Sequence, residues 1–316
     1  MTAPLLVLGV SRSGTTMLRV ILDRSPSLAI PDESFFVPLL ARRHGGRRLD
    51  RRRFLEDVGR IPTIAAWGLS VDDVAFRVAA GARVGEAIAA IFEAYAAKDG
   101  KPRWGDKTPM YMRHLPLLER LFPRAQYVHL IRDGRDAALS FLQMPEGTFT
   151  RTWAHPRNVR QFACLWRTEV SSACALGERV GPSRYLEVRY DDLVADPQGV
   201  VGGICDFAGL AFEAAMTRYA GSVDVSAKPH QQRLLEPPTV GVRDWRWELR
   251  AEDVSAFEGV AGELLARLGY DVVERRSASV LGRVALLRYR LLLAAWNLAT
   301  TAVQRSPLWR RRHPPL

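Results

Sequence analysis

The segment that most constrains the fold is an apolar run, a glycine-containing loop and a helix pattern, in that order, near the N-terminus. The run LLVLGV (5–10) is continuously apolar, which is typical of a strand buried on both faces of a parallel sheet. Residues 15–24 have helical spacing, with Leu18, Ile21 and Leu22 on one side. The loop between them therefore meets a helix N-terminus, where backbone N–H groups and the helix dipole favour a bound anion.

The loop itself, GVSRSGTT (9–16), has the glycine spacing of a phosphate-binding loop, but Thr15 stands where a nucleotide hydrolase carries lysine. Transfer of a γ-phosphoryl group relies on that lysine, usually with Mg²⁺, to balance charge on the phosphate oxygens. Arg12 lies inside the loop instead, and its guanidinium, two hydroxyls and the backbone amides can still bind a 5′-phosphate. The loop therefore predicts a nucleotide site that does not serve a γ-phosphate.

The remaining chain alternates strand and helix patterns, which predicts an α/β protein with a P-loop-type, mainly parallel central sheet flanked by helices. Further strands are expected at 125–133 and 183–193. Helices are expected at 72–97, 159–176, 197–210 and 251–268.

Composition divides the chain into regions. Residues 1–274 are expected to form one α/β domain, in which 41–103 is a basic and helical insertion between sheet strands. Residues 275–316 are expected to form a basic amphipathic C-terminal extension with apolar helical faces. Three roles stay open for this extension: it packs on the core, pairs with a second copy, or lies on an anionic membrane surface.

The 316-residue chain has a formal net charge of +11, which indicates an arginine-biased composition, an anionic ligand or surface, or both. No nucleic acid partner is expected. Cys164, Cys174 and Cys205 have neither metal-ligand nor disulfide spacing and suit a reducing compartment. Neither a signal peptide nor a membrane-spanning run is recognised. A cytoplasmic protein is therefore expected, with a peripheral position at the inner membrane face if the extension binds lipid.

A second candidate phosphate site follows the strand expected at 125–133. Arg132 ends this strand, and Ser140 lies eight residues later in the following helix pattern. Together these two side chains are placed to hold a separate phosphate.

Five segments, in consistent order over residues 4–272, resemble PAPS-dependent sulfotransferases. GVSRSGTTMLRVIL resembles the 5′-phosphosulfate loop of that family, and LIRDGRDAALS resembles its 3′-phosphate motif. WGDKTP, RYDDLVADP and RAEDVSAFEGVAGELLARLGY are similar to segments of the bacterial branch and of tyrosylprotein sulfotransferases. The resemblance implies transfer of the sulfuryl group of 3′-phosphoadenosine 5′-phosphosulfate (PAPS) to an acceptor hydroxyl, with adenosine 3′,5′-bisphosphate (PAP) as the leaving group and no metal.

The resemblance also implies the donor-binding residues. The 5′-phosphosulfate contacts would be Arg12, Ser13, Gly14, Thr15 and Thr16. Arg132 and Ser140 would bind the 3′-phosphate, Tyr190 would contact the nucleotide, and Arg243 would place a basic group against it. The protein-tyrosine branch has a further arginine where this chain has Met144, and Arg135 or Arg243 is the candidate to replace it.

For catalysis, the resemblance implies Glu33 as the base that accepts the acceptor's proton and Lys107 as the cation that stabilises the bridging oxygen. Asp32 is the alternative base. A histidine base of another branch leaves His44, His155 and His230 as minor candidates, whereas His129, between apolar residues of a strand, is expected to be structural.

Asp133 has two interpretations. It resembles a magnesium-binding aspartate at a strand end, but the helix pattern after it favours a helix-capping role. Two other functions stay open: a P-loop small-molecule kinase that uses ATP–Mg²⁺, and a non-catalytic, membrane-associated nucleotide-binding protein. The acceptor could be a small metabolite, a lipid, a glycan or a tyrosine, and the sequence predicts no oligomeric state.

Overall fold

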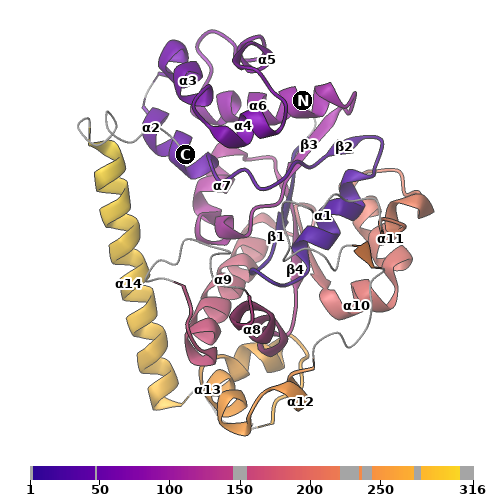
Figure 1. Cartoon of the computed structure of the whole chain (residues 1–316), viewed down its shortest axis with the longest axis vertical. Helices are drawn as coiled ribbons and strands as arrows, with labels where there is room; N and C mark the ends of the chain where they lie inside the picture. The colour runs from indigo at the N-terminus through magenta and orange to yellow at the C-terminus, as the bar shows by residue number, and fades with distance from the viewer. Residues whose placement is uncertain are drawn as a thin grey trace.

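The computed structural model describes residues 3–46, 48–144, 155–220, 235–236, 244–273 and 279–306. Its centre is a five-stranded sheet of order β2-β3-β1-β4-β5 in which all the described pairings are parallel (Figure 1). The strands are β1 (Leu5–Leu8), β2 (Leu28–Ala29), β3 (Arg103–Asp106), β4 (Gln126–Ile131) and β5 (Tyr185–Arg189). The prediction of a parallel α/β sheet is confirmed.

The central strand β1 shows why a continuous apolar run was required. Leu5 and Val7 point into one core, and Leu6 and Leu8 point into another, on opposite faces of the sheet. All four side chains are at most 3% exposed. β1 therefore has no solvent-facing side, and alternation with polar residues would leave buried polar groups unpaired.

Helices cover both faces of the sheet (Figure 1). On the face of Leu5 and Val7 the core is closed by α1 (Thr15–Asp23), α10 (Tyr190–Ala195) and α11 (Pro197–Ala208). On the other face it is closed by α7 (Leu115–Leu121), α8 (Gly134–Leu142), α9 (Val159–Val180) and α13 (Ala251–Arg267). Three shorter elements complete the main body: η1 (Pro109–Arg113), η2 (Ala214–Thr217) and α12 (Trp245–Glu248).

Five helices lie between β2 and β3, at the top of Figure 1. They are α2 (Val37–His44), α3 (Arg51–Val58), α4 (Pro62–Ala66), α5 (Val71–Ala75) and α6 (Val84–Lys98). Aromatic packing joins them to the sheet, because Phe92 of α6 stacks on Trp104 of β3 with ring centroids 4.6 Å apart. The inserted helices thus share the core of the second face.

The last helix, α14 (Val280–Arg305), lies along the outside of the molecule against α9, α13 and α2 (Figure 1). Its start is fixed by a close approach, since a Cβ on Gly282 would lie only 1.9 Å from the carbonyl oxygen of Gly259. Leu286 is buried in the core of the second face. Within the described parts of the chain, every helix is too short or too polar to cross a membrane.

Several predicted elements have different bounds, and two of them differ in element type or in continuity. The strand expected at 183–193 ends at Arg189, and Tyr190 begins α10, where Asp191 and Asp192 in the first turn favour the helix N-terminus. The helix expected at 72–97 is two helices, α5 and α6, separated by a segment in which Gly81 has φ 76°. Alanine-rich periodicity alone did not indicate that break.

Candidate functional site

The predicted site groups follow the carboxyl ends of all five strands. The phosphate loop follows β1, Glu33 follows β2, Lys107 follows β3, Arg132 follows β4 and Tyr190 follows β5. Because the strands are parallel, these ends meet at one edge of the sheet, the usual place for a ligand in such folds. The strand order also sorts the groups, with Glu33 and Lys107 on one side of the loop and Arg132 and Tyr190 on the other.

The phosphate loop depends on two glycines. A Cβ on Gly9 would lie 2.8 Å from the carbonyl oxygen of Leu130, and one on Gly14 would lie 2.6 Å from two ring carbons of Tyr190. Gly14 has φ 87° and precedes the first residue of α1, so its left-handed conformation turns the chain into the helix. Arg12 also has a positive φ, of 74°, which is unusual for a residue with a Cβ, and such strained residues cluster at active and ligand sites.

On the β2–β3 side of the loop, three predicted residues meet. Nζ of Lys107 lies 2.5 Å from Oε1 of Glu33 and donates to the hydroxyl of Thr16 at 3.1 Å. The Lys107 side chain is 2% exposed and the Glu33 side chain 26% exposed. Burial lowers the pKa of Lys107, and the adjacent Glu33 carboxylate opposes that shift. The arrangement offers a carboxylate to the outside, with the cation and the loop behind it.

A buried hydrogen-bond network joins the segments that carry Glu33 and Lys107. The hydroxyl of Ser34 donates to Asp106 at 2.8 Å, and the backbone N–H of Ser34 donates to the hydroxyl of Thr108 at 3.0 Å. The Tyr111 hydroxyl lies 2.7 Å from that of Ser34. Burial raises the pKa of Asp106 to about 7. This network was not predicted from the sequence, where its only signal is that Ser34 and Asp106 adjoin Glu33 and Lys107.

Asp32, the alternative base, has a different partner. Its carboxylate pairs with Nη2 of Arg19 at 3.1 Å, and Nη1 of Arg19 donates to the carbonyl oxygen of Ile30 at 3.3 Å. Arg19 thereby ties the segment after β2 to α1. This pair holds the Asp32 carboxylate against α1.

On the β4–β5 side, the two predicted phosphate sites join. Nε of Arg12 donates to the hydroxyl of Ser140 at 2.9 Å, and Nη1 of Arg132 donates to the carbonyl oxygen of Arg12 at 3.2 Å. The guanidinium of Arg132 stacks on the Tyr190 ring at 4.5 Å, and the indole N–H of Trp166 fixes the Arg132 carbonyl. Among the described atoms, Nε of Arg132 is buried and has no hydrogen-bond partner. A buried unpaired guanidinium N–H on a side chain stacked against an aromatic ring fits a nucleotide phosphate.

Arg135 does not replace the arginine missing at Met144. Its side chain is fully buried and pairs with Asp133 at 2.6 Å and with Glu258 at 2.6 Å. Asp133 also accepts from the backbone N–H of Arg135 at the start of α8, which confirms the capping interpretation. Arg243 lies outside the described residues, so its predicted nucleotide contact stays a prediction.

The histidines have other surroundings. His129 is fully buried, its Nδ1 lies 2.7 Å from the Tyr185 hydroxyl, and burial lowers its pKa to about 3, as suits a structural residue. Cys174 and Glu187 lie near it in a group that could hold a metal, but the Tyr185 hydroxyl already donates to Glu187 at 3.1 Å. His44 pairs with Asp57 in the inserted helices, and His230 lies outside the described residues.

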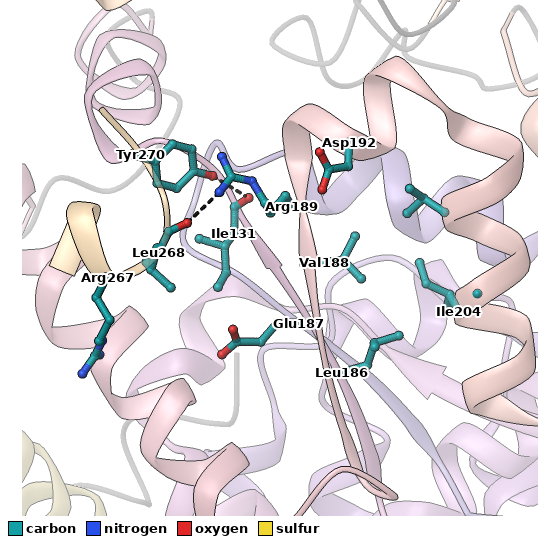
Figure 2. A pocket seen from close by; sticks show the side chains of 12 residues that line it. Ile131, Leu186, Glu187, Val188, Arg189, Asp192, Ile204, Arg267, Leu268 and Tyr270 are labelled. Carbon is teal, nitrogen blue, oxygen red and sulfur yellow. Dashed lines mark hydrogen bonds between the residues drawn. The ribbon is translucent and has the colours of Figure 1, made fainter. Parts of the chain in front are cut away.

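Figure 2 shows a cavity of about 510 Å³ beside the edge strand β5. None of the predicted site residues lines it. Arg189 reaches across this cavity and donates to the carbonyl oxygen of Leu268 at 2.6 Å, while the Tyr270 hydroxyl donates to Ile131 (Figure 2). These contacts join β5 to the end of α13, so we assign the cavity to the packing of that edge.

Comparison with known proteins identifies relatives of this arrangement. A family model described as "Sulfotransferase family" matches residues 4–214. Nodulation protein NoeE of Sinorhizobium fredii is 26% identical over 92% of this chain and 72% of its own length. Protein-tyrosine sulfotransferase A of Caenorhabditis elegans is 24% identical over 85% of this chain and 68% of its own.

Solved structures agree with the fold. The sulfotransferase domain from the curacin biosynthetic pathway superposes with a TM-score of 0.55, at 21% identity, over 86% of this chain and 99% of that domain. The sulfotransferase domain of the Synechococcus PCC 7002 olefin synthase gives a TM-score of 0.52, at 26% identity, over 86% of this chain and 97% of that domain.

Proposed function

The chain belongs to the sulfotransferase family, and from that premise we propose a role for each group at the strand ends. The protein is a PAPS-dependent sulfotransferase, which moves the sulfuryl group of PAPS to an acceptor hydroxyl. The observation that carries the assignment of roles is the meeting of Glu33, Lys107 and Thr16 on one side of the phosphate loop, opposite Arg132 and Tyr190.

The donor is proposed to lie across the loop. Backbone amides at the start of α1 and the hydroxyls of the loop, with Arg12, hold its 5′-phosphosulfate. Arg132 and Ser140 hold its 3′-phosphate, with Tyr190 against the nucleotide, and Arg243 is proposed as a further basic contact. The buried unpaired Nε of Arg132 supports this orientation. We expect no metal requirement, since a guanidinium and an ammonium already supply positive charge at both ends.

Transfer is proposed to occur at the β2–β3 side. Glu33, the more exposed member of the ion pair, takes the proton of the acceptor hydroxyl as its oxygen attacks sulfur, which breaks the bond between sulfur and the bridging oxygen. Lys107 donates a hydrogen bond to that bridging oxygen as it gains charge on the leaving bisphosphate. The acceptor is proposed to approach from beyond β2, the edge of the sheet. Small metabolites, lipids, glycans and tyrosine all present a suitable hydroxyl.

The two alternative functions are not favoured. A kinase would need a group in place of the absent loop lysine, and Asp133, its candidate metal ligand, is bound to Arg135 and caps α8. A non-catalytic binding protein does not explain why a buried lysine meets a carboxylate next to the loop.

Donor binding is tested by calorimetry with PAP, AMP and ATP–Mg²⁺. A hydrogen bond to a charged group is worth roughly 1.5–3 kcal/mol, so the 3′-phosphate should tighten binding about tenfold to a hundredfold over AMP. Arg132→Ala should abolish that gain, whereas the exposed control Arg52→Ala should keep it. Tighter binding of ATP–Mg²⁺, without a gain from the 3′-phosphate, would favour the kinase hypothesis instead.

The base is tested by Glu33→Gln, with Asp32→Asn as a matched carboxylate-to-amide control at the next position. Transfer of labelled sulfuryl to a panel of phenols, sugars and lipid alcohols should fall by about 10²–10⁴-fold in Glu33→Gln, because the acceptor keeps its proton. PAP affinity should be retained in both variants. An equal loss of transfer in the two variants would reject Glu33 as the specific base.

A further inference from the structure

Helix α14 leaves one apolar face uncovered. Its opposite face packs on the core, where Leu286 is buried and Ala285 and Tyr289 contact the same cluster. Figure 1 shows α14 at the outer edge of the molecule, with α9 and α13 on one side of it. The uncovered face therefore points away from the rest of the described chain.

Five large apolar side chains recur on this uncovered face and form a stripe, which we call the α14 stripe: Val280, Val284, Leu287, Leu291 and Leu298. Their spacings of four, three, four and seven residues keep them on one side of a helix with 3.6 residues per turn. Each leaves 59–74% of its surface exposed. A contiguous exposed apolar surface of this kind marks a site of interaction.

Arginines border the α14 stripe on both sides. Helical spacing places Arg283 and Arg290 along one edge and Arg288 along the other, and all three are exposed. The sequence of α14 contains no aspartate and no glutamate. An apolar stripe between cationic edges is the pattern of a helix that lies in a membrane interface, with its apolar side chains in the acyl region and its guanidinium groups at anionic head groups.

We propose that α14 docks this sulfotransferase on an anionic lipid surface, with the helix parallel to the membrane and the α14 stripe inserted. Charge complementarity selects this occupant over a second copy of the chain. Two copies of α14 face to face would bring arginines together without a carboxylate on either helix to pair with them. The buried Leu286 and the close contact at Gly282 keep the stripe directed outward, so the lipid surface meets a preformed face.

The proposal is tested by flotation of the full chain with vesicles of phosphatidylcholine alone and with vesicles in which about a third of the lipid is phosphatidylserine. A stripe variant carries Leu287→Ser, Leu291→Ser and Leu298→Ser, and its control is Phe76→Ser, which changes an apolar side chain that is 90% exposed on another surface. A charge variant carries Arg283→Gln, Arg288→Gln and Arg290→Gln. Its control, Arg52→Gln with Arg53→Gln and Arg60→Gln, removes the same charge from exposed arginines near α3.

Wild type and both controls should float with the phosphatidylserine vesicles, and the stripe and charge variants should bind at least about tenfold more weakly. Each variant should keep its affinity for PAP, which shows that the fold is intact and separates this test from that of the donor site. Flotation of the stripe variant at the wild-type level would overturn the proposal. A wild-type dimer in light scattering that the stripe variant converts to a monomer would assign the stripe to a second copy instead.

Discussion

At the residue scale, the candidate site depends on how a buried lysine is held next to the phosphate loop. Lys107 is almost completely buried, and its ammonium donates to Glu33 and to the Thr16 hydroxyl. A lysine buried in this way is costly unless a carboxylate compensates it. Asp106, the residue before it, is also buried, but its raised pKa keeps it largely protonated below neutral pH. One negative charge at Glu33 thus faces one positive charge at Lys107.

The pKa of Asp106 gives a stability prediction. The folded state holds its proton up to about pH 7, whereas an unfolded aspartate releases it near 3.8. The free energy of unfolding should therefore fall as pH rises from about 4 to 7, by at most about 1.4 kcal/mol per pH unit from this group. Asp106→Asn removes the titrating group and keeps an oxygen for Ser34 and Thr108. In urea unfolding, the free energy of unfolding of the variant relative to wild type should be higher at pH 8 than at pH 5. Parallel pH profiles of the two proteins would contradict the raised pKa of Asp106.

The positions of single residues were predictable to different degrees. The phosphate loop was evident from its pattern, because glycine spacing between a strand and a helix is a local property. Arg132 was singled out by its place at a strand end, whereas Glu33 and Lys107 were singled out through family resemblance; the structure brings Glu33 and Lys107 together. The bond from Ser34 to Asp106 joins residues 72 positions apart, so no local pattern predicts it.

At the element scale, one buried arginine fixes the start of α8 to α13. Arg135 reaches Asp133 on its own helix cap, Glu258 on α13 and the carbonyl oxygen of Asp271 after α13. Its guanidinium also stacks on Trp245 of α12 at 3.6 Å. Since Arg132 lies immediately before this cap, the packing of three helices determines where the proposed 3′-phosphate contact stands.

Arg135→Ala should therefore be strongly destabilising. Removal of the guanidinium that pairs with two buried carboxylates, Asp133 and Glu258, should lower the free energy of unfolding by about 3–5 kcal/mol. Arg179→Ala, which breaks a half-exposed pair with Glu119, should cost about 1 kcal/mol or less. Denaturant unfolding of both variants measures the difference. Similar losses of stability in the two variants would mean that the buried ion pairs of Arg135 do not hold α8 against α13.

The elements themselves were mostly predictable, and their boundaries were less so. A continuous apolar run indicated β1, and a mainly apolar run that includes His129 indicated β4; both strands are buried on two sides. The end of β5 was missed because Tyr190 has strand propensity, whereas the acidic residues after it start a helix. For α14, the sequence showed an amphipathic pattern, but only tertiary packing shows which of its apolar faces is covered.

At the scale of the whole molecule, the order of the strands sets the relative positions of the candidate site groups. The sheet places β1 between β3 and β4, so the loop proposed to hold one end of the donor stands between the proposed transfer groups and the proposed 3′-phosphate groups. This order is not a local property of any segment, and it was not predicted. Helix α14 contacts α9, α13 and α2 of the main body. Its proposed lipid contact would therefore give the whole molecule one fixed orientation relative to a membrane.

The spacing of the five parallel strands also fixes the distances between the groups that follow them. Neighbouring strands are about 4.8 Å apart, so the three intervals from β3 to β5 set roughly 14 Å between the ends that carry Lys107 and Tyr190. Helices can shift and loops can lengthen without altering that interval, because backbone hydrogen bonds fix it. The proposed donor site is thus spanned by strands of fixed spacing, while β2 is the outermost strand on the side from which the acceptor is proposed to approach. A scaffold built this way can exchange acceptors over time and keep the same donor.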